Sequence, residues 1–592
     1  MADGAEATQA APGRRGGGAP KVAAGILLSR LAGLVREQAV AFCFGVGPHA
    51  DALTAALRVP NALQNLLGEG ALSAAFIPLY SRLVEEGRRE EAGRFAGAIF
   101  GLLLAAAAGL ALAGVLLARP LVAVLAPGFL GDAAAVAAGR QAVDRFALSV
   151  DAVRILFPMT GCLVLSVWAL GILNSHRRFF LPYFAPVLWN SSMIAALLLA
   201  GHGARAVLAA AGGGAAGAAG GAGGAAGGGG IAGAAGPALL AVRDHLLIAF
   251  CRGAMVGGAL QFLVQLPVVA RVIRGFRLSF STAVPGVREA LAAWGPVVAG
   301  RGVVQIAGYV DLFLATLLAT GAASADRYAQ MLYILPISLF GMSIAAAELP
   351  ELSRLRGEAA KPALLERVHR ALGAVAFLNV PTVVGYLAFG YLVVGAVYRR
   401  GSFGGADHGL VYLALSGYSL GILATTSSRL LQNTFYALGD TRAPARIAVL
   451  RVGSAALLAL PLMFWLDRFP VPSAFGPPPA QPLYLGALGL AIASGAGAWI
   501  ELLSLRAALR RRLAAFDLPW RDDLRMILLA LAAAVPAALL WRFLPLRSGL
   551  LTAVPVLATY GLGYLAAAHL AGRPEMAAVA RRLRRAKPDR LP

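Results

Sequence analysis

Residues 95–118 have the sequence FAGAIFGLLLAAAAGLALAGVLLA, which contains no charged side chain. A helix of about 20 such residues crosses the roughly 30 Å of hydrocarbon in a lipid bilayer. Similar runs recur along the whole chain of 592 residues, of which 59% are apolar and 14% are charged. A soluble domain averages about 45–50% apolar and about 25% charged residues. The composition therefore excludes a soluble enzyme and predicts an all-α, polytopic membrane protein.

Fourteen apolar stretches along the chain are predicted to be membrane helices. They lie near residues 22–46, 50–81, 95–118, 146–173, 179–201, 246–270, 289–320, 328–352, 371–398, 407–437, 443–466, 483–505, 526–545 and 549–571. The first of these runs has no small-residue cleavage site, so we expect it to be retained as a span.

The basic residues between the spans indicate the orientation of the chain. The chain has 52 Lys and Arg against 29 Asp and Glu, a net charge of +23. With the N-terminus in the cytoplasm, 33 of the basic residues fall on cytoplasmic segments and 10 on the opposite loops. This bias follows the positive-inside rule and predicts that both termini face the cytoplasm. Because the charge is spread over short loops, it does not indicate a nucleic-acid partner.

An internal repeat relates the two halves of the chain. AAFIPLYSRL at residues 74–83 closes the second predicted span, and AAELPELSRL at residues 346–355 closes the eighth. The offset of six spans is even, so the repeats are parallel and predict two six-helix lobes with the substrate between them. The predicted divisions are a cytoplasmic tail (1–21), an N-lobe (22–274), a C-lobe (275–512), a C-terminal helix pair (513–571) and a basic cytoplasmic tail (572–592).

Two other features predict neither a fold nor a site. Residues 204–241 form an external loop that is almost entirely Gly and Ala, which favours a flexible linker. The three cysteines, Cys43, Cys162 and Cys251, lie in separate apolar segments without CxxC spacing, which excludes a disulfide framework or a zinc ribbon.

Several predicted spans carry polar residues on one helical face. A charged side chain inside a membrane costs at least about 2.5–3.5 kcal/mol, so each one needs a cavity or a partner. The polar sets are Arg30, Arg36 and Glu37 in span one; Asp51, Arg58, Asn65 and Glu69 in span two; Arg301, Gln305, Gly308 and Asp311 in span seven; and Arg429, Asn433, Tyr436 and Asp440 in span ten. In span one, Arg30 and Glu37 share a face, and Arg36 points about 120° away. Stripes of this length predict a water-filled cavity, and its arginines suit a phosphate-bearing anion.

The alternative interpretation of the same residues is internal ion pairing that holds helices together. The candidate pairs are Arg30 with Glu37, Arg58 with Asp51, and Arg301 with Asp311. For any single pair, internal ion pairing explains the charged residues as well as a substrate site does. For the whole set the cavity is favoured, because span one has two arginines and one acid.

An ordered series of motifs resembles a known family. The motifs are SRLAGLVRE (29–37), Phe44-Gly45, Asp51, Pro60-Asn61, EGALS (69–73), FIP (76–78), QFLVQLP (261–267) and GSF (401–403). In this order they resemble the bacterial lipid II flippase family (MurJ/MviN) of the MOP exporter superfamily. The likeness covers nearly all of the chain and weakens after about residue 450.

The resemblance implies a transporter rather than an enzyme, working by alternating access in the bacterial inner membrane. Its substrate would be lipid II, the undecaprenyl-diphosphate-linked precursor needed for peptidoglycan biosynthesis, cell wall biogenesis and cell shape. Membrane lipids would surround the protein, and the C-terminal helix pair would line a groove for the polyprenyl tail. The resemblance also suggests the cell-wall synthesis machinery as a partner.

The resemblance also assigns substrate-binding residues, with two departures from the family pattern. Family arginines match Arg30 and Arg36, and a family acid matches Asp51. Family arginines are missing at Gln64–Asn65 and at Met331, and Arg58 and Arg301 are the candidates to replace them. The full predicted set of substrate-binding residues is Arg30, Arg36, Asp51, Arg58, Asn65, Glu69, Arg301 and Gln305.

The energy source is expected to be either a coupling ion or the membrane potential, without another cofactor. A sodium site known in some members of the family suggests Asp311 and Asp440 as sodium ligands. Two other functions of the same superfamily remain open from the sequence, an exporter of another polyprenyl-linked saccharide and a drug or cation antiporter. A different class is a membrane-embedded glycan polymerase or a cell-wall scaffold. The polymerase is disfavoured, because it would need a catalytic acid in a large external loop, and the one long external loop has no acid before Asp244.

Overall fold

A computed structural model describes residues 19–67, 69–215, 236–355, 360–477, 481–513, 516–544 and 549–576. Within these ranges, the side chains of residues 19–24, 26, 59, 61–75, 203–215, 236–237, 296–307 and 346 lie outside the description. The described chain is helical, apart from loops and one isolated bridge between Pro470 and Tyr484.

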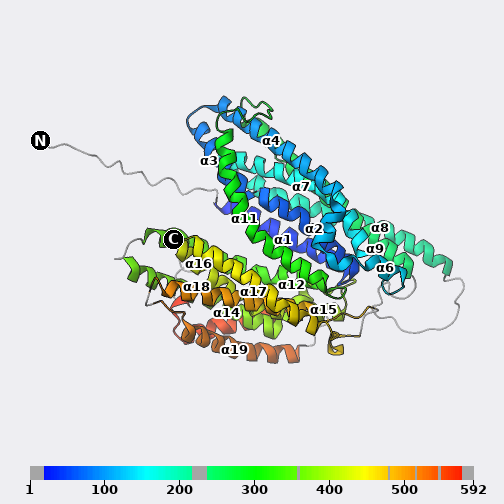
Figure 1. Cartoon of the computed structure of the whole chain (residues 1–592). Helices are drawn as coiled ribbons and strands as arrows, with labels where there is room; N and C mark the ends of the chain where they lie inside the picture. The colour runs from blue at the N-terminus through cyan, green and yellow to red at the C-terminus, as the bar shows by residue number, and fades with distance from the viewer. Residues whose placement is uncertain are drawn as a thin grey trace, which may run out of the picture.

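Helices account for the architecture (Figure 1). In the first half they are α1 (Ala19–Phe44), α2 (Pro48–Leu67), α3 (Glu69–Glu85), α4 (Arg89–Leu116), α5 (Ala118–Leu125), η1 (Pro127–Phe129), α6 (Asp132–Ala137), α7 (Arg145–Ser175), α8 (Phe180–Ala215), α9 (Gly236–Leu263) and α10 (Leu266–Val272). In the second half they are α11 (Val287–Thr316), α12 (Ala322–Pro336), η2 (Ile337–Gly341), α13 (Met342–Arg354), α14 (Lys361–Tyr398), α15 (Gly405–Ser419), α16 (Ile422–Ala437), α17 (Arg442–Leu466), η4 (Ser473–Phe475), α18 (Gly486–Arg510), α19 (Trp520–Phe543) and α20 (Gly549–Leu570).

The all-helical membrane fold is confirmed, but the count of fourteen spans is not. In the described part of the chain, eleven helices are long and apolar enough to cross a membrane, or twelve if the bent pair α5 and η1–α6 forms one span. The predicted spans near 22–46, 50–81 and 289–320 coincide with α1, α2–α3 and α11, which are helices but do not belong to the eleven. These three spans carry the predicted polar stripes of the N-lobe and of span seven, which lower their mean hydropathy.

Buried side chains group the helices into two lobes that share a core at one end. One large apolar cluster takes residues from α1, α2, α7 and α9 and also from α11, α12, α14, α15 and α18. It lies toward the ends that the sequence predicts to be external. The opposite halves have separate clusters, one around Phe76, Phe95 and Trp168 in the N-lobe and one around Leu430 and Leu505 in the C-lobe. The lobes are therefore packed together at the predicted external end.

Helix α11 runs between the two lobes (Figure 1). Its first turns, at Val287 and Ala290, belong to the N-lobe cluster with Phe95. Its last turns, at Leu312 and Leu314, belong to the core that both lobes share. Along its length it packs on α2 and α3 as well as on α12, α17 and α18. A movement of one lobe against the other therefore has to involve α11.

The segment that joins the two lobes lies against α4. A Cβ atom at Gly93 would lie 1.9 Å from the carbonyl oxygen of Arg274, and one at Gly97 would lie 2.1 Å from that of Arg277. The N–H of Ser279 also donates to the carbonyl oxygen of Gly97 at 3.5 Å. Glycine at this spacing on α4 lets the joining backbone approach the helix directly, which fixes the linker on the N-lobe.

The predicted linker at 204–241 is shorter than expected. Helix α8 continues to Ala215, and α9 begins at Gly236. Alanine is the strongest helix former, so the Ala-rich ends of the segment extend the two helices. The central residues 216–235 lie outside the described ranges.

Candidate functional site

A polar cavity of about 120 Å³ lies where α1, α2, α11 and α12 meet, and so between the two lobes. The described residues of its lining include six charged side chains, which is unusual inside a membrane protein. The lining residues are Arg36, Glu37, Thr54, Leu57, Arg58, Asp311, Leu312, Ala315, Ala323, Asp326, Arg327 and Gln330.

Two arginines of this cavity share one carboxylate. Nη2 of Arg36 lies 2.5 Å from Oε1 of Glu37, and Nη2 of Arg327 lies 2.7 Å from the same oxygen. Glu37 is only 2% exposed. Since Glu37 lies on α1 and Arg327 on α12, this bridge joins residues that are 290 positions apart and belong to different lobes.

The third arginine of the cavity contacts backbone rather than an acid. Nη2 of Arg58 on α2 donates to the carbonyl oxygen of Gly308 on α11 at 2.9 Å. Together, Arg36, Arg58 and Arg327 present three guanidinium groups from both lobes to one cavity. A guanidinium group matches the geometry of phosphate oxygens, so this arrangement can hold a phosphate-bearing anion.

Two of the proposed internal ion pairs are wrong. Arg30 does not pair with Glu37 but donates to the hydroxyl of Ser338 in η2 at 2.6 Å, and it is exposed outside the cavity. Arg58 does not pair with Asp51, because each has partners on α11 or α12 instead. Face assignments from an ideal helix missed this arrangement, because the partner helices were unknown.

Asp51 lies at the predicted external end, where it caps a helix of the other lobe. Its carboxylate accepts from the N–H of Gly321 at 2.6 Å and from the N–H of Ser324 at 2.8 Å, at the start of α12. Arg145 adds a contact of 3.5 Å and is itself held by Asp132 at 2.6 Å. A buried carboxylate at a helix N-terminus satisfies free N–H groups and interacts favourably with the helix dipole.

Further hydrogen bonds join the lobes at the same end. The N–H of Val46 donates to Asp407 at 3.1 Å, and the hydroxyl of Tyr328 donates to the carbonyl oxygen of Gly45 at 3.2 Å. The N–H of Ser402 donates to the carbonyl oxygen of Phe42 at 2.8 Å. We call these contacts, with those of Asp51, the external seal.

The other predicted site residues are four substrate-binding residues and the two predicted sodium ligands, Asp311 and Asp440. The side chains of Asn65, Glu69, Arg301 and Gln305 lie outside the described residues. Asp311 lines the cavity.

Asp440 lies in the turn before α17 and accepts from the N–H groups of Arg442 at 2.9 Å and Ala443 at 3.1 Å, and from Arg512 at 2.5 Å. These hydrogen bonds, above all the one from the N–H of Ala443, hold the pKa of Asp440 below its usual range. Asp440 does not line the cavity that contains Asp311, so the sodium site at these two residues stays a prediction.

A second, larger polar cavity of about 490 Å³ lies within the C-lobe, between α11, α16, α17 and α18. Asp311 lines both cavities. Inside the second one, Glu501 accepts from Arg451 at 2.8 Å and from Gln432 at 2.8 Å. The buried carboxylate of Glu501 on α18 therefore contacts both α16 and α17.

Comparison with known proteins gives the family. The family model described as "Lipid II flippase MurJ" matches residues 40–554. The chain belongs to the lipid II flippase family. A relative from Burkholderia cenocepacia, named lipid II flippase MurJ, is 28% identical over 493 residues, which cover 82% of each chain.

Solved structures agree with the fold. A structure described as lipid II flippase MurJ in an inward closed conformation matches with a TM-score of 0.67 and 19% identity, covering 93% of this chain and 98% of that chain. An inward-facing multidrug resistance transporter of the MATE family in the MOP superfamily matches with a TM-score of 0.60 and 13% identity, covering 84% and 98%. The chain is therefore a multi-pass transporter of this fold and not an enzyme, and a drug antiporter is not favoured.

Arg327 is the cavity arginine that sequence reasoning missed. The predicted eighth span began at residue 328, so Arg327 was assigned to a loop, whereas α12 begins at Ala322. Arg327 lies four residues before Met331, the position at which the resemblance implied a family arginine. Positions four apart lie on the same face of a helix, so this spacing was the available signal.

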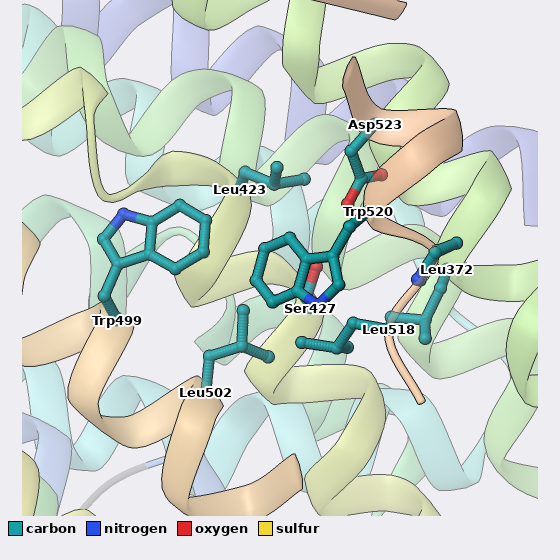
Figure 2. A pocket seen from close by; sticks show the side chains of 9 residues that line it. Leu372, Leu423, Ser427, Trp499, Leu502, Leu518, Trp520 and Asp523 are labelled. Carbon is teal, nitrogen blue, oxygen red and sulfur yellow. The ribbon is translucent and has the colours of Figure 1, made fainter. Parts of the chain in front are cut away.

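An apolar groove of about 600 Å³ runs along the outside of the C-lobe between α14, α18 and α19. At one end the indole rings of Trp499 and Trp520 stack, with ring centroids 6.0 Å apart, and Leu423 and Leu502 lie beside them (Figure 2). The resemblance placed the lipid-tail groove at the C-terminal helix pair. Among the described residues, α19 contributes to the groove lining and α20 does not.

Replacing Gly308 with alanine is expected to reduce transport about tenfold without loss of folded protein. A Cβ atom at Gly308 would lie 2.4 Å from Nη2 of Arg58, which would displace this guanidinium from its carbonyl partner. Alanine favours a helix over glycine by up to about 1 kcal/mol, so helix stability itself should not fall. The measurement is the transport rate at equal protein level in the membrane. Gly109→Ala on α4, where a Cβ atom has no neighbour within 4 Å, is the matched control, and equal rates for both variants would contradict the role of Arg58.

Proposed function

We propose that this chain moves lipid II from the cytoplasmic to the outer leaflet by alternating access, with the diphosphate held by Arg36, Arg58 and Arg327. The observation that carries the proposal is the presence of these three guanidinium groups, from α1, α2 and α12, on one cavity between the lobes. Because the site is built from both lobes, a bound anion interacts with both and biases how they are arranged.

Glu37 orients two of the three arginines for binding an anion. Its carboxylate accepts from Arg36 and Arg327 and so holds both side chains toward the same point. A diphosphate offers more acceptor oxygens than one carboxylate and can replace Glu37 as the partner of these arginines. The cavity of about 120 Å³ suits the diphosphate, and the apolar groove beside Trp520 suits part of the polyprenyl tail.

The external seal sets the direction of access. With the lobes packed together at the predicted external end, the substrate enters from the predicted cytoplasmic side. Outward opening requires Asp51 to leave the N-terminus of α12 and the two lobes to rock apart along α11. Both termini are cytoplasmic in this proposal, as the distribution of basic residues predicts.

The membrane potential supplies the energy in this proposal. Each elementary charge that crosses the full field is worth about 2.3 kcal/mol per 100 mV. With a negative cytoplasm, the anionic diphosphate is driven outward. The half-cycle that carries the substrate therefore runs down the potential.

The test is complementation of a bacterial strain depleted of its lipid II flippase, combined with an assay of lipid II exposure on the outer leaflet. We expect the chain to support growth and to expose lipid II, and we expect exposure to stop when the membrane potential is dissipated. Growth without lipid II exposure would contradict the proposed substrate. Exposure that continues without a membrane potential would contradict the proposed energy source but not the substrate.

A further inference from the structure

The charges that line the cavity cancel. Among the described lining residues there are three guanidinium groups and three carboxylates, those of Glu37, Asp311 and Asp326. Glu37 is paired with two arginines. For Asp311 and Asp326, the described part of the chain provides no arginine within 4.0 Å. With every group ionised the lining has no net charge, which is a poor environment for a diphosphate.

Among the residues that the structure describes, Asp326 is held only by neutral donors. It is 6% exposed, and its carboxylate accepts from the hydroxyl of Tyr418 at 2.5 Å and from the side-chain amide of Gln330 at 2.8 Å. Gln330 also donates to the hydroxyl of Tyr418 at 3.0 Å, which orients that hydroxyl toward the carboxylate. The three side chains form a closed network at the cavity wall, in which the carboxylate has no cationic partner.

We infer that Asp326 is a proton-binding site linked to the substrate: it is ionised in the empty cavity and takes up one proton when a diphosphate occupies the three arginines. The inference rests on the proposed function. A carboxylate and a diphosphate that share one small cavity repel each other, and the repulsion is strong where water is scarce. Protonation of Asp326 removes this repulsion and leaves the lining with a net positive charge.

The other ionisable groups near α12 already have partners or opposite charges. Asp311 faces the charges of Arg58 and Arg451 from two sides. On the helices packed against α12, the remaining groups and their partners are Asp51 with Gly321, Ser324 and Arg145; Glu37 with Arg36 and Arg327; Asp407 with Val46 and Gly404; His408 with the carbonyl oxygen of Tyr391; and Glu501 with Arg451. Asp326 also feels the charge of Arg58, but the like charge of Asp311 outweighs it, so the surrounding charges stabilise ionised Asp326 less than the other two acids of the cavity.

Linkage is reciprocal, so a proton that improves substrate binding is also bound more tightly when substrate is present. The affinity for lipid II is expected to fall about tenfold per pH unit over the range in which the empty site is ionised and the occupied site is protonated. Below that range Asp326 is protonated in both states, and the affinity no longer depends on its titration.

The experiment is calorimetric titration of the full-length purified protein with lipid II, in pairs of buffers with different ionisation heats and at several pH values. The two phosphates of lipid II stay ionised across neutral pH, so buffer-dependent heat that follows the pH dependence of affinity reports protons bound by the protein. We expect an uptake of about one proton per lipid II for the wild type. Binding with equal heats in the two buffers would overturn the inference and leave the proposed function standing. Failure of the wild type to bind lipid II would overturn both.

Asp326→Asn and Asp311→Asn are the matched pair of variants, because each removes one carboxylate from the cavity wall. Asp326→Asn mimics the protonated side chain, so we expect wild-type affinity at low pH, tighter binding than the wild type at high pH, and no proton uptake. A gain in affinity is not a result that misfolding can produce. Asp311→Asn is expected to keep the proton uptake. If uptake persists in Asp326→Asn and is lost in Asp311→Asn, the assignment to Asp326 is overturned.

Discussion

Replacing Arg327 with alanine is expected to abolish complementation of a flippase-depleted strain while the protein still reaches the membrane. The change removes one of the three guanidinium groups of the cavity and one of the two arginines that hold Glu37. A hydrogen bond to a charged group is worth about 1.5–3 kcal/mol, which corresponds to roughly ten- to hundredfold weaker binding of a diphosphate. The measurements are growth, membrane abundance and lipid II exposure.

Moving the arginine along α12 provides the control. Met331→Arg in the Arg327→Ala background restores a guanidinium one helical turn further on, on the same helix face and at the position where the resemblance implied a family arginine. We expect this double variant to regain part of the activity, whereas Arg154→Ala on the exposed surface of α7 should keep full activity. Full activity of Arg327→Ala alone would show that the cavity does not bind the substrate through this residue.

Replacing Asp51 with asparagine is expected to open the external seal and to stop transport. An asparagine keeps one acceptor oxygen but presents an NH₂ group where the carboxylate accepted from Gly321 or Ser324. Loss of one charge-assisted hydrogen bond, at about 1.5 kcal/mol or more, changes the ratio of sealed to open molecules by more than tenfold. The contact with buried Arg145 is weakened by the same change.

The natural thiol of Cys43 reports the state of the seal. Cys43 is half-buried and follows Phe42, whose carbonyl oxygen accepts from Ser402 across the lobes. With Cys162 and Cys251 replaced by alanine, a membrane-impermeant maleimide added outside is expected to label Cys43 more than tenfold faster in Asp51→Asn than in the parent. Asp144→Asn is the control, because Asp144 caps α7 within the N-lobe by accepting from Ala147 at 3.0 Å. Equal labelling of the parent and Asp51→Asn would contradict the role of Asp51 in the seal.

Sequence patterns identified the charged residues of the cavity better than they identified the residues that these charges contact. Arg36 and Arg58 were singled out as charges inside spans, and both lie on the cavity. Arg30 was selected by the same reasoning but lies outside it and contacts Ser338. Arg327 and Asp326 were missed because a span boundary was placed a few residues too late. Helix ends are set by which residues the rest of the fold covers, and that information is absent from hydropathy alone.

The sequence by itself determined that the chain is a helical membrane protein of the lipid II flippase family, because hydropathy, helix formation and motif order are local properties. Only the tertiary structure decided which charges meet. Glu37 forms an ion pair with Arg327, which is 290 residues away in the sequence. Asp51 accepts from Gly321 at the start of a helix, which is 270 residues away in the sequence. Such contacts depend on how helices of different lobes pack. The same packing joins the lobes at the predicted external end and brings three arginines to one cavity. Within the described part of the chain, it leaves Asp326 with only neutral hydrogen-bond donors.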